Sequence, residues 1–138
     1  VKVNYLPKPN FSLPSICLPD GKGQFTNQSS IDDGSEALFS YLWNFNDPYD
    51  PSSSTLKEPM HKYSALGPYN IQLKITSKDG CIDSLTRSLT TIYPQPKGNF
   101  TATPAEVCVG DTVVFKDLGN GMGSAAITWA WSLGNGDI

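Results

Sequence analysis

The stretch Tyr69-Asn70-Ile71-Gln72-Leu73-Lys74-Ile75-Thr76 decides the fold of this chain. Its apolar side chains occupy every second position, and polar side chains occupy the positions between them. This alternation predicts a β-strand in a sheet with one buried face and one exposed face. Ser77-Lys78-Asp79-Gly80 follows directly, and Asp-Gly is typical of the turn of a β-hairpin.

Two further strands are predicted on either side of this one. The first covers residues 84–92, and the second covers residues 38–45 with alternate aromatic side chains on one face. Short strands separated by Gly, Pro, Asn and Ser predict an all-β fold, an antiparallel β-sandwich. The polar segments 28–36 and 46–58 are expected to form loops at its ends, where such folds commonly bind ligands.

The composition limits the classes of function. The chain has 138 residues with a formal net charge of −3, which argues against nucleic-acid binding through a basic surface. No apolar run approaches the roughly 20 residues that span a bilayer, and no signal-peptide pattern begins at Val1, so we expect an internal segment or a processed chain. One histidine and three cysteines leave few side chains for catalysis.

An internal repeat sets the predicted domain organisation. Matching residues lie 88 to 91 positions apart: Lys8-Pro9-Asn10-Phe11 and Lys97-Gly98-Asn99-Phe100, Cys17 and Cys108, Phe25 and Phe115, Tyr41 and Trp129, Trp43 and Trp131. This spacing fits one small β-sandwich per repeat. We therefore expect residues 1–7 to be the end of a preceding unit or a linker. Residues 8–96 are expected to form a complete sandwich and residues 97–138 the first half of a second.

Three ordered motifs then resemble one domain family. They are Trp43-Asn44-Phe45-Asn46-Asp47, Pro59-Met60-His61-Lys62-Tyr63 and Gly67-Pro68-Tyr69-Asn70-Ile71-Gln72-Leu73. They are similar to the Trp-Asp-Phe-Gly-Asp-Gly, Pro-x-His-x-Tyr and Gly-x-Tyr-x-Val-x-Leu motifs of the PKD (polycystic kidney disease) domain. The resemblance covers about residues 9–93 and begins again in residues 97–138. Asn44, Asn46 and Pro48 depart from the pattern, which weakens a ligand site in that motif but not the core.

The resemblance implies an immunoglobulin-like sandwich, repeated in tandem, in an extracellular or cell-surface protein. Residues at the matching positions would be structural: Trp43, Phe45, Asp47, His61, Tyr63, Gly67 and Tyr69. Such domains act as spacers or adhesive modules. The placement of the cysteines resembles repeats in large secreted surface proteins of Bacteroidetes, some of which are adhesins or accompany hydrolases.

Within this resemblance we expect a disulfide between Cys17 and Cys81, at one end of the sandwich. Cys108 matches Cys17 and would then find its partner outside residues 97–138. The alternative is three reduced thiols. The sequence contains no Cys-x-x-Cys motif and no Cys/His cluster, so we expect neither a zinc site nor another metal or cofactor.

Each remaining candidate site has a structural interpretation that the sequence favours. A catalytic His61 would need a serine or cysteine nucleophile, and no nucleophile motif such as Gly-x-Ser-x-Gly is present. Tyr69 is expected to hydrogen-bond back to the chain as a tyrosine corner, with sugar stacking as the alternative. Trp129 and Trp131 are expected to pack in a core, with an exposed binding platform as the alternative.

The acidic loops offer a calcium alternative. Asn46 and Asp47 with Asp50, or Asp32 and Asp33 with Glu36, would supply oxygen ligands, but neither set has EF-hand spacing. We therefore expect solvated loops. From the sequence we expect a spacer or adhesion module rather than an enzyme. Its expected partners are other domains of the same protein and a protein or polysaccharide ligand. The alternative is a carbohydrate-binding accessory domain of a secreted hydrolase, with exposed aromatics such as Tyr49 stacking on sugar rings.

Overall fold

The computed structural model describes residues 1–123 and 128–134. The chain divides into two compact units, Val1–Tyr93 and Pro94–Ile138, here called unit 1 and unit 2. The described residues form short β-strands and a single-turn 3₁₀ helix, η1 (Glu36–Leu38). Among them there is no helix of the length and apolar character that crossing a bilayer requires.

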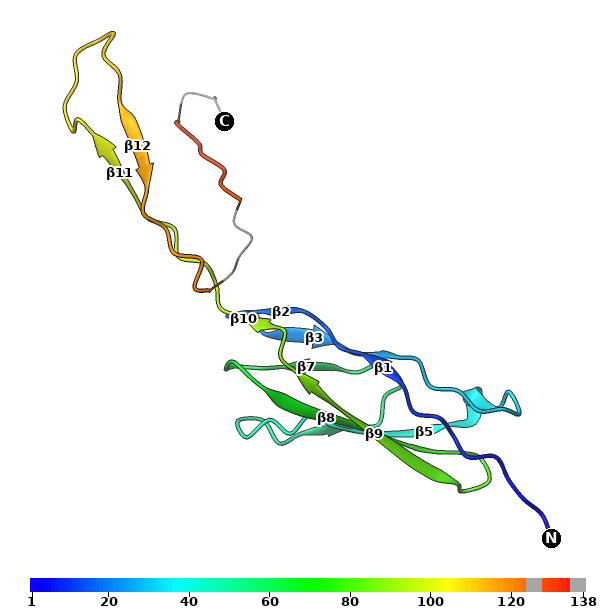
Figure 1. The fold of residues 1–138 in the computed structure, drawn as a ribbon. Coiled ribbons are helices and arrows are strands. Elements are labelled where there is room, and N and C mark those ends of the chain that lie inside the picture. The colour runs from blue at the N-terminus through cyan, green and yellow to red at the C-terminus, as the bar shows by residue number, and fades with distance from the viewer. Residues whose placement is uncertain (124–127, 135–138) are drawn as a thin grey trace. The chain divides into compact units, whose positions relative to one another are not determined.

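Unit 1 is built on a four-stranded antiparallel sheet (Figure 1). Its strand order is β6 (Ser53–Ser54), β5 (Ser40–Asn44), β8 (Tyr69–Thr76) and β9 (Ile82–Leu89). The predicted strand 69–76 is confirmed with the predicted bounds, and its alternate side chains are buried. The predicted hairpin turn is confirmed as well: the Ser77 amide donates to the Cys81 carbonyl at 2.9 Å, and Gly80 has a φ of +83° that favours glycine.

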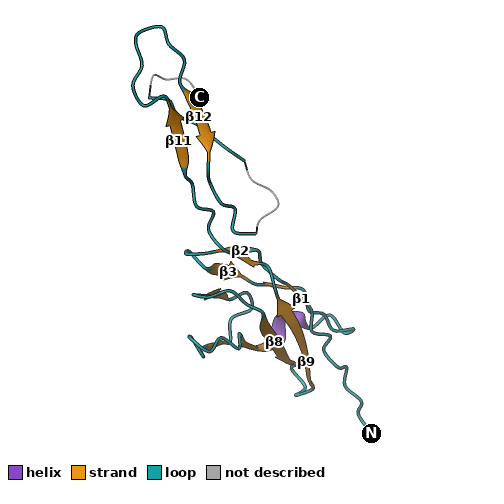
Figure 2. Cartoon of the chain, turned by 60° about the vertical axis from the view of Figure 1, so that its left-hand side comes forward, coloured by secondary structure: helices purple, strands orange, loops and turns teal. Residues whose placement is uncertain are grey.

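Shorter strand pairs form the second layer of unit 1 (Figure 2). The pairs are β1 (Phe11–Ser12) with β4 (Thr26–Asn27), β3 (Lys22–Gln24) with β7 (Met60–Lys62), and β2 (Ile16–Cys17) with β10 (Ile92–Tyr93). The first two pairs are antiparallel, as predicted for a sandwich. The β2–β10 pair is parallel, which the sequence analysis did not foresee.

Two predicted strand boundaries were wrong. The strand expected over 84–92 is instead divided into β9, which covers Ile82–Leu89, and β10, which begins at Ile92 after two intervening residues. The break occurs because β10 pairs with β2 of the other layer rather than with β8. The strand expected over 38–45 is β5, over Ser40–Asn44, because residues 36–38 form η1.

The core of unit 1 lies between the two layers and centres on Trp43, which is fully buried. Its indole nitrogen Nε1 donates to the Leu56 carbonyl at 3.0 Å, so the polar atom is satisfied. Its ring packs edge-on against Phe11, with centroids 5.1 Å apart, and tilted against Phe25 at 5.7 Å. The buried apolar residues that pack in one cluster are Phe11, Ile16, Phe25, Ile31, Phe39, Trp43, Phe45, Tyr63, Tyr69, Ile71, Leu73, Ile75, Leu89 and Ile92.

Unit 2 contains one antiparallel strand pair, β11 (Phe100–Thr103) with β12 (Val114–Asp117). Phe100 lies opposite Asp117 in this pair, at the positions that match Phe11 and Asn27 of the β1–β4 pair. An isolated bridge between Lys97 and Asn120 likewise matches the bridge between Lys8 and Ser30. The segment 128–134 is described but forms no strand.

The predicted disulfide between Cys17 and Cys81 is corrected by the structure, in which both cysteines are free thiols. Cys17 lies opposite Tyr93 in the β2–β10 pair, beyond the last residue of β9. Cys81 lies in the hairpin turn between β8 and β9, directly before the first residue of β9. An eight-residue strand is about 26 Å long, so the two thiols are at opposite ends of the sandwich. Cys108 is also free.

Candidate functional site

The sequence motifs bring two polar side chains, Asp47 and His61, together as a buried pair in the core of unit 1. Trp43 and Phe45 point inward, and the same alternation places Asp47 inward, where only 2% of the residue is exposed. One oxygen of Asp47, Oδ1, accepts the Tyr49 amide at 2.9 Å. The other, Oδ2, lies 3.3 Å from Nε2 of His61. A buried carboxylate needs such partners because it has lost its water.

His61 is enclosed by rings as well as by the carboxylate. Its imidazole stacks on Phe45 at 4.3 Å between centroids with 15° between planes, and it meets Tyr63 edge-on at 4.6 Å. The residue is 4% exposed, so a substrate does not reach it. No hydroxyl or thiol hydrogen-bonds to His61 among the described residues. The contacts of His61 are those of a residue that holds β7 against the end of β5.

The two tyrosines of the motif region differ in what their hydroxyls meet. The Tyr69 hydroxyl donates to the Ala65 carbonyl at 3.0 Å, which confirms the predicted tyrosine corner. The Tyr63 hydroxyl is buried without a hydrogen-bond partner among the described residues. Burial, with the nearby Asp47 charge adding to it, raises the pKa of Tyr63 well above its usual value. A side chain at Gly67 would place Cβ 2.9 Å from the Leu89 carbonyl oxygen, so this corner needs glycine.

The acidic loops are occupied by groups of the chain itself. Asp33 accepts from the Ser35 hydroxyl at 2.6 Å and lies 2.9 Å from the Lys78 ammonium. These contacts, the Ser35 hydrogen bond first, lower the pKa of Asp33 to about 2. Glu36 accepts the Ile31 amide at 3.1 Å. Over residues 1–123 and 128–134, no three His, Cys, Asp or Glu side chains come together as a metal would require.

Tyr49 is the exposed aromatic of the predicted ligand-binding loop. It is 72% exposed, although its own amide is held by buried Asp47. The loop thus presents a ring to solvent on an anchored backbone, and exposed rings of this kind are available for stacking on a ligand.

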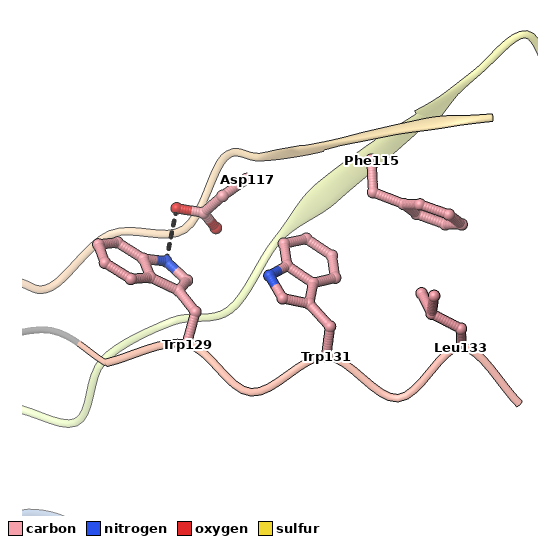
Figure 3. Close-up of a pocket in the computed structure, with 5 residues that line it drawn as sticks. All are labelled: Phe115, Asp117, Trp129, Trp131 and Leu133. Atoms are coloured by element: carbon pink, nitrogen blue, oxygen red, sulfur yellow. Dashed lines mark hydrogen bonds between the residues drawn. The ribbon is translucent and has the colours of Figure 1, made fainter. Parts of the chain in front are cut away.

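A second exposed aromatic surface lies in unit 2, and we call it the open aromatic face. Figure 3 shows Trp129, Trp131 and Leu133 projecting from one extended segment toward Phe115 and Asp117. The indole nitrogen of Trp129 donates to Oδ2 of Asp117 at 2.9 Å. Trp129 is 61% exposed and Leu133 is 50% exposed. A hollow between the five side chains is open to solvent.

The exposure of Trp129 differs from the sequence prediction. We expected Trp129 and Trp131 to be core residues because they match Tyr41 and Trp43. Trp131 is only partly buried, although it packs against Phe100 and Phe115, and Trp129 is largely exposed. Their two-residue spacing was the available signal, because it places both rings on one side of an extended chain.

Two packed β-layers around a buried tryptophan, closed by a tyrosine corner, define an immunoglobulin-like sandwich module. The model of the PKD domain family matches residues 6–92, and the chain belongs to this family.

Two solved structures are similar to the chain. The PKD1 domain of Epp from Vibrio anguillarum is 27% identical with a TM-score of 0.55, over 65% of this chain and 98% of that domain. The PKD1 domain of the metalloprotease PrtV from Vibrio cholerae is 26% identical with a TM-score of 0.52, over 63% of this chain and 98% of that domain. A comparison with curated proteins finds no match.

Membership of the family carries general properties. PKD domains are generally extracellular, non-catalytic modules of larger proteins, some of which are proteases. In this chain the aromatic, acidic and histidine residues of the motifs are buried in the core, and the exposed aromatics include Tyr49 in the 46–58 loop and Trp129 in unit 2.

Proposed function

We propose that the chain is a non-catalytic spacer and adhesion segment of a larger, multi-repeat extracellular protein. Residues 8–96 form one complete PKD-like unit, residues 97–138 are the first half of a second, and residues 1–7 connect to what precedes. Its partners are other domains of the same surface protein and a protein or polysaccharide ligand. The resemblance to Bacteroidetes surface proteins favours a cell-surface setting.

One observation carries this proposal: the strand register of unit 1 recurs in unit 2. Phe11 lies opposite Asn27, and Phe100 lies opposite Asp117, 89 and 90 positions further along the chain. Backbone hydrogen bonds repeat as well, since the Gln28 amide donates to Asn10 and the Leu118 amide donates to Asn99, both at 2.8 Å. A chain of successive sandwiches holds a distal domain away from a surface.

The burial of the motif residues supports a role without catalysis. Asp47 and His61 form the one carboxylate–imidazole pair among the described residues, and both are at most 4% exposed. General acid–base chemistry needs the pair within hydrogen-bond reach of a substrate. A pair enclosed by Phe45 and Tyr63 serves packing instead.

The spacer role can be tested by placing the full chain between a surface anchor and a fluorescent reporter. A flexible glycine–serine linker of the same number of residues serves as the matched control. The account predicts a reporter distance that varies less than with the flexible linker. It also predicts that Tyr49→Ala leaves this distance unchanged, because the Tyr49 ring is exposed. A spread of distances equal to that of the flexible linker would contradict the proposal.

A second function, carbohydrate binding, is favoured by the exposed ring of Tyr49 on its anchored loop. Affinity electrophoresis of the full chain through soluble polysaccharides, with and without Ca²⁺, tests it. Retardation by one glycan that is lost in Tyr49→Ala would support this function. Tyr5→Ala, which removes another exposed tyrosine, is the matched control and should keep the retardation. No retardation by any glycan would leave the spacer and adhesion role.

A further inference from the structure

One face of the four-stranded sheet in unit 1 points away from the core, and we call it the outer sheet face. Side chains alternate along β5, β8 and β9, so the even-numbered residues point outward and the odd-numbered residues face the other layer. The strand register aligns the outward residues in rows across the sheet. One such row is Asn44, Gln72 and Thr86.

A hollow of about 280 Å³ opens on this face beside the row. Lys74 lies within it, opposite Leu42 on β5 and opposite Ser84 on β9. The lining combines hydroxyl groups, one ammonium group and the apolar side chain of Leu42, which is 44% exposed. The residues that line the hollow are Ser40, Tyr41, Leu42, Thr55, Lys74 and Thr76.

The outer sheet face carries a single positive charge and no negative one. Among the even-numbered residues of β5, β8 and β9, all of which the structure describes, Lys74 is the only charged residue. The ion pairs within residues 1–123 and 128–134 do not include it. An ammonium group on a surface without carboxylates attracts an anionic ligand, even in a chain whose net charge is −3.

We propose that the outer sheet face binds an acidic polysaccharide whose sugars each carry one carboxylate. This inference rests on the polysaccharide ligand of the proposed function and names its chemical class. The ligand carboxylate pairs with the Lys74 ammonium in the hollow. The amides of Asn44 and Gln72 and the hydroxyl of Thr86 exchange hydrogen bonds with hydroxyl groups of neighbouring sugars. Asn44 is already oriented, because its Oδ1 accepts the Asn46 amide at 3.0 Å.

The shape and chemistry of the face favour a polymer of sugars over other occupants. Pockets for small ligands hold about 300–1,000 Å³, so this hollow fits only part of a ligand that continues along the row. Protein interfaces centre on aromatic or arginine anchors, and the outward residues of β5, β8 and β9 include neither. One ammonium group also matches a polymer with one carboxylate per sugar better than a densely sulfated one.

Surface plasmon resonance of the full chain on immobilised polygalacturonate tests the proposal. Immobilised dextran is the neutral control, and immobilised dextran sulfate is the sulfated one. We expect binding to polygalacturonate, no binding to dextran, and weaker binding to dextran sulfate than to polygalacturonate. Binding should weaken as the salt concentration rises from about 0.05 M to about 0.5 M, because salt screens exposed charges.

Variants connect the binding to the outer sheet face. Lys74→Gln should weaken it about fivefold, which is the upper range for one exposed ion pair, and Lys74→Arg should retain it. Gln72→Ala should also weaken it, because an amide that bonds the sugar is removed. Lys62→Gln is the matched control, since it makes the same charge change on exposed β7 of the other layer, and it should bind like the wild type. Urea midpoints check that each variant folds.

Four results would overturn the proposal. Absence of binding to polygalacturonate, or equal binding to dextran, would exclude an acidic ligand. Stronger binding to dextran sulfate would assign the attraction to sulfate groups. Equal losses in Lys74→Gln and Lys62→Gln would assign it to net charge rather than to this face.

The last result separates this inference from the functions proposed above. Binding that is lost in Tyr49→Ala but kept in Lys74→Gln would place the sugar at the 46–58 loop, so carbohydrate binding would stand while the outer sheet face would not be its site. The reporter-distance measurement is independent of all these results. Failure of this inference is therefore distinct from failure of the spacer role.

Discussion

Units 1 and 2 contain the same aromatic corner in two states of burial. In unit 1 the corner formed by Phe11, Phe25 and Trp43 packs in one cluster with the inward side chains of β8 and is fully buried. In unit 2 the rings of Phe100 and Phe115 keep similar contacts with tryptophan while remaining about half exposed. The comparison separates two contributions to the corner. The strands that carry the rings set the contact geometry between them, and a strand further along the chain contributes to their burial.

Most of the stabilisation that this corner provides comes from burial of its rings rather than from their pair contacts. An aromatic side chain buries about 150–250 Å², worth about 4–6 kcal/mol at about 25 cal/mol per Å². An aromatic pair adds only about 0.5–1.5 kcal/mol beyond that burial. Unit 1, in which the rings are fully buried, therefore gains most of the stabilisation that burial of this corner can provide. Unit 2 retains the pair contacts but gains less from burial.

The largest effect is expected when the two matched tryptophans are compared. Trp43→Ala should lower the free energy of unfolding by about 3–5 kcal/mol, because it empties a fully buried site. Trp131→Ala should lower it by no more than about 1 kcal/mol, because its surroundings are largely exposed. Urea unfolding followed by far-UV circular dichroism measures both. Equal losses would show that unit 2 has a buried core of its own.

A comparable contrast is expected between a buried and an exposed carboxylate. Asp47→Ala should cost about 3 kcal/mol, because it leaves buried His61 and the Tyr49 amide without their acceptor. Asp117→Ala removes the acceptor of the exposed Trp129 indole and should change stability by about 0.5 kcal/mol or less. Urea midpoints of the two variants provide the measurement. A small loss in Asp47→Ala would mean that the buried pair does not hold β7 to β5.

The two motif tyrosines should respond in opposite directions to loss of the hydroxyl. Tyr63→Phe should raise the free energy of unfolding by about 1 kcal/mol, because a buried hydroxyl without a partner is removed. Tyr69→Phe should lower it by about 1 kcal/mol, because the hydrogen bond to the Ala65 carbonyl is lost. Thermal unfolding of both variants checks the signs. Destabilisation by Tyr63→Phe would reveal a hydrogen-bond partner for that hydroxyl.

The smallest effect concerns pH and a surface ion pair. The ion pairs among the described residues all lie in unit 1, and one joins Asp33 to Lys78 in the β8–β9 turn. The pKa of Asp33 is lowered from 3.8 to about 2 in the folded chain, so its ionised form stabilises the fold above pH 3.8. This contribution is lost as the pH falls through 2.

Asp33→Asn tests this contribution through the pH dependence of the unfolding midpoint. The variant should unfold at a slightly lower urea concentration than the wild type between pH 5 and pH 7. The difference should shrink as the pH falls from 3.8 toward 2 and disappear only below pH 2, where Asp33 is protonated in both the folded and the unfolded state. A difference that stays constant down to pH 2 would show that the carboxylate charge has no part in it.

The sequence was sufficient where a structural signal was local and strict. The alternation over 69–76 predicted β8 with its bounds, because a sheet with one buried face requires a period of two. The tyrosine corner followed from Tyr69 and from Gly67 two residues before it. Glycine is needed there because the Leu89 carbonyl approaches closely. The matched rings of unit 2 were also predictable, because they repeat a local pattern.

The remaining features depend on contacts between distant segments. The break between β9 and β10 arises because Ile92 and Tyr93 pair with the other layer, which no local pattern encodes. The spacing of Cys17 and Cys81 along the chain did not reveal that the two thiols lie at opposite ends of the sandwich. The exposure of Trp129 was missed because matching it to Tyr41 assumes that a covering strand is present.

Hydrogen exchange of the full chain tests the central claim most directly. The claim is that the same corner is covered in unit 1 and open in unit 2. We predict strong protection of the amides of β5 and β8, which are paired in the sheet. Residues 128–132, the counterpart of β5, should exchange near the rate of an unstructured peptide. Equal protection of β5 and residues 128–132 would contradict the claim.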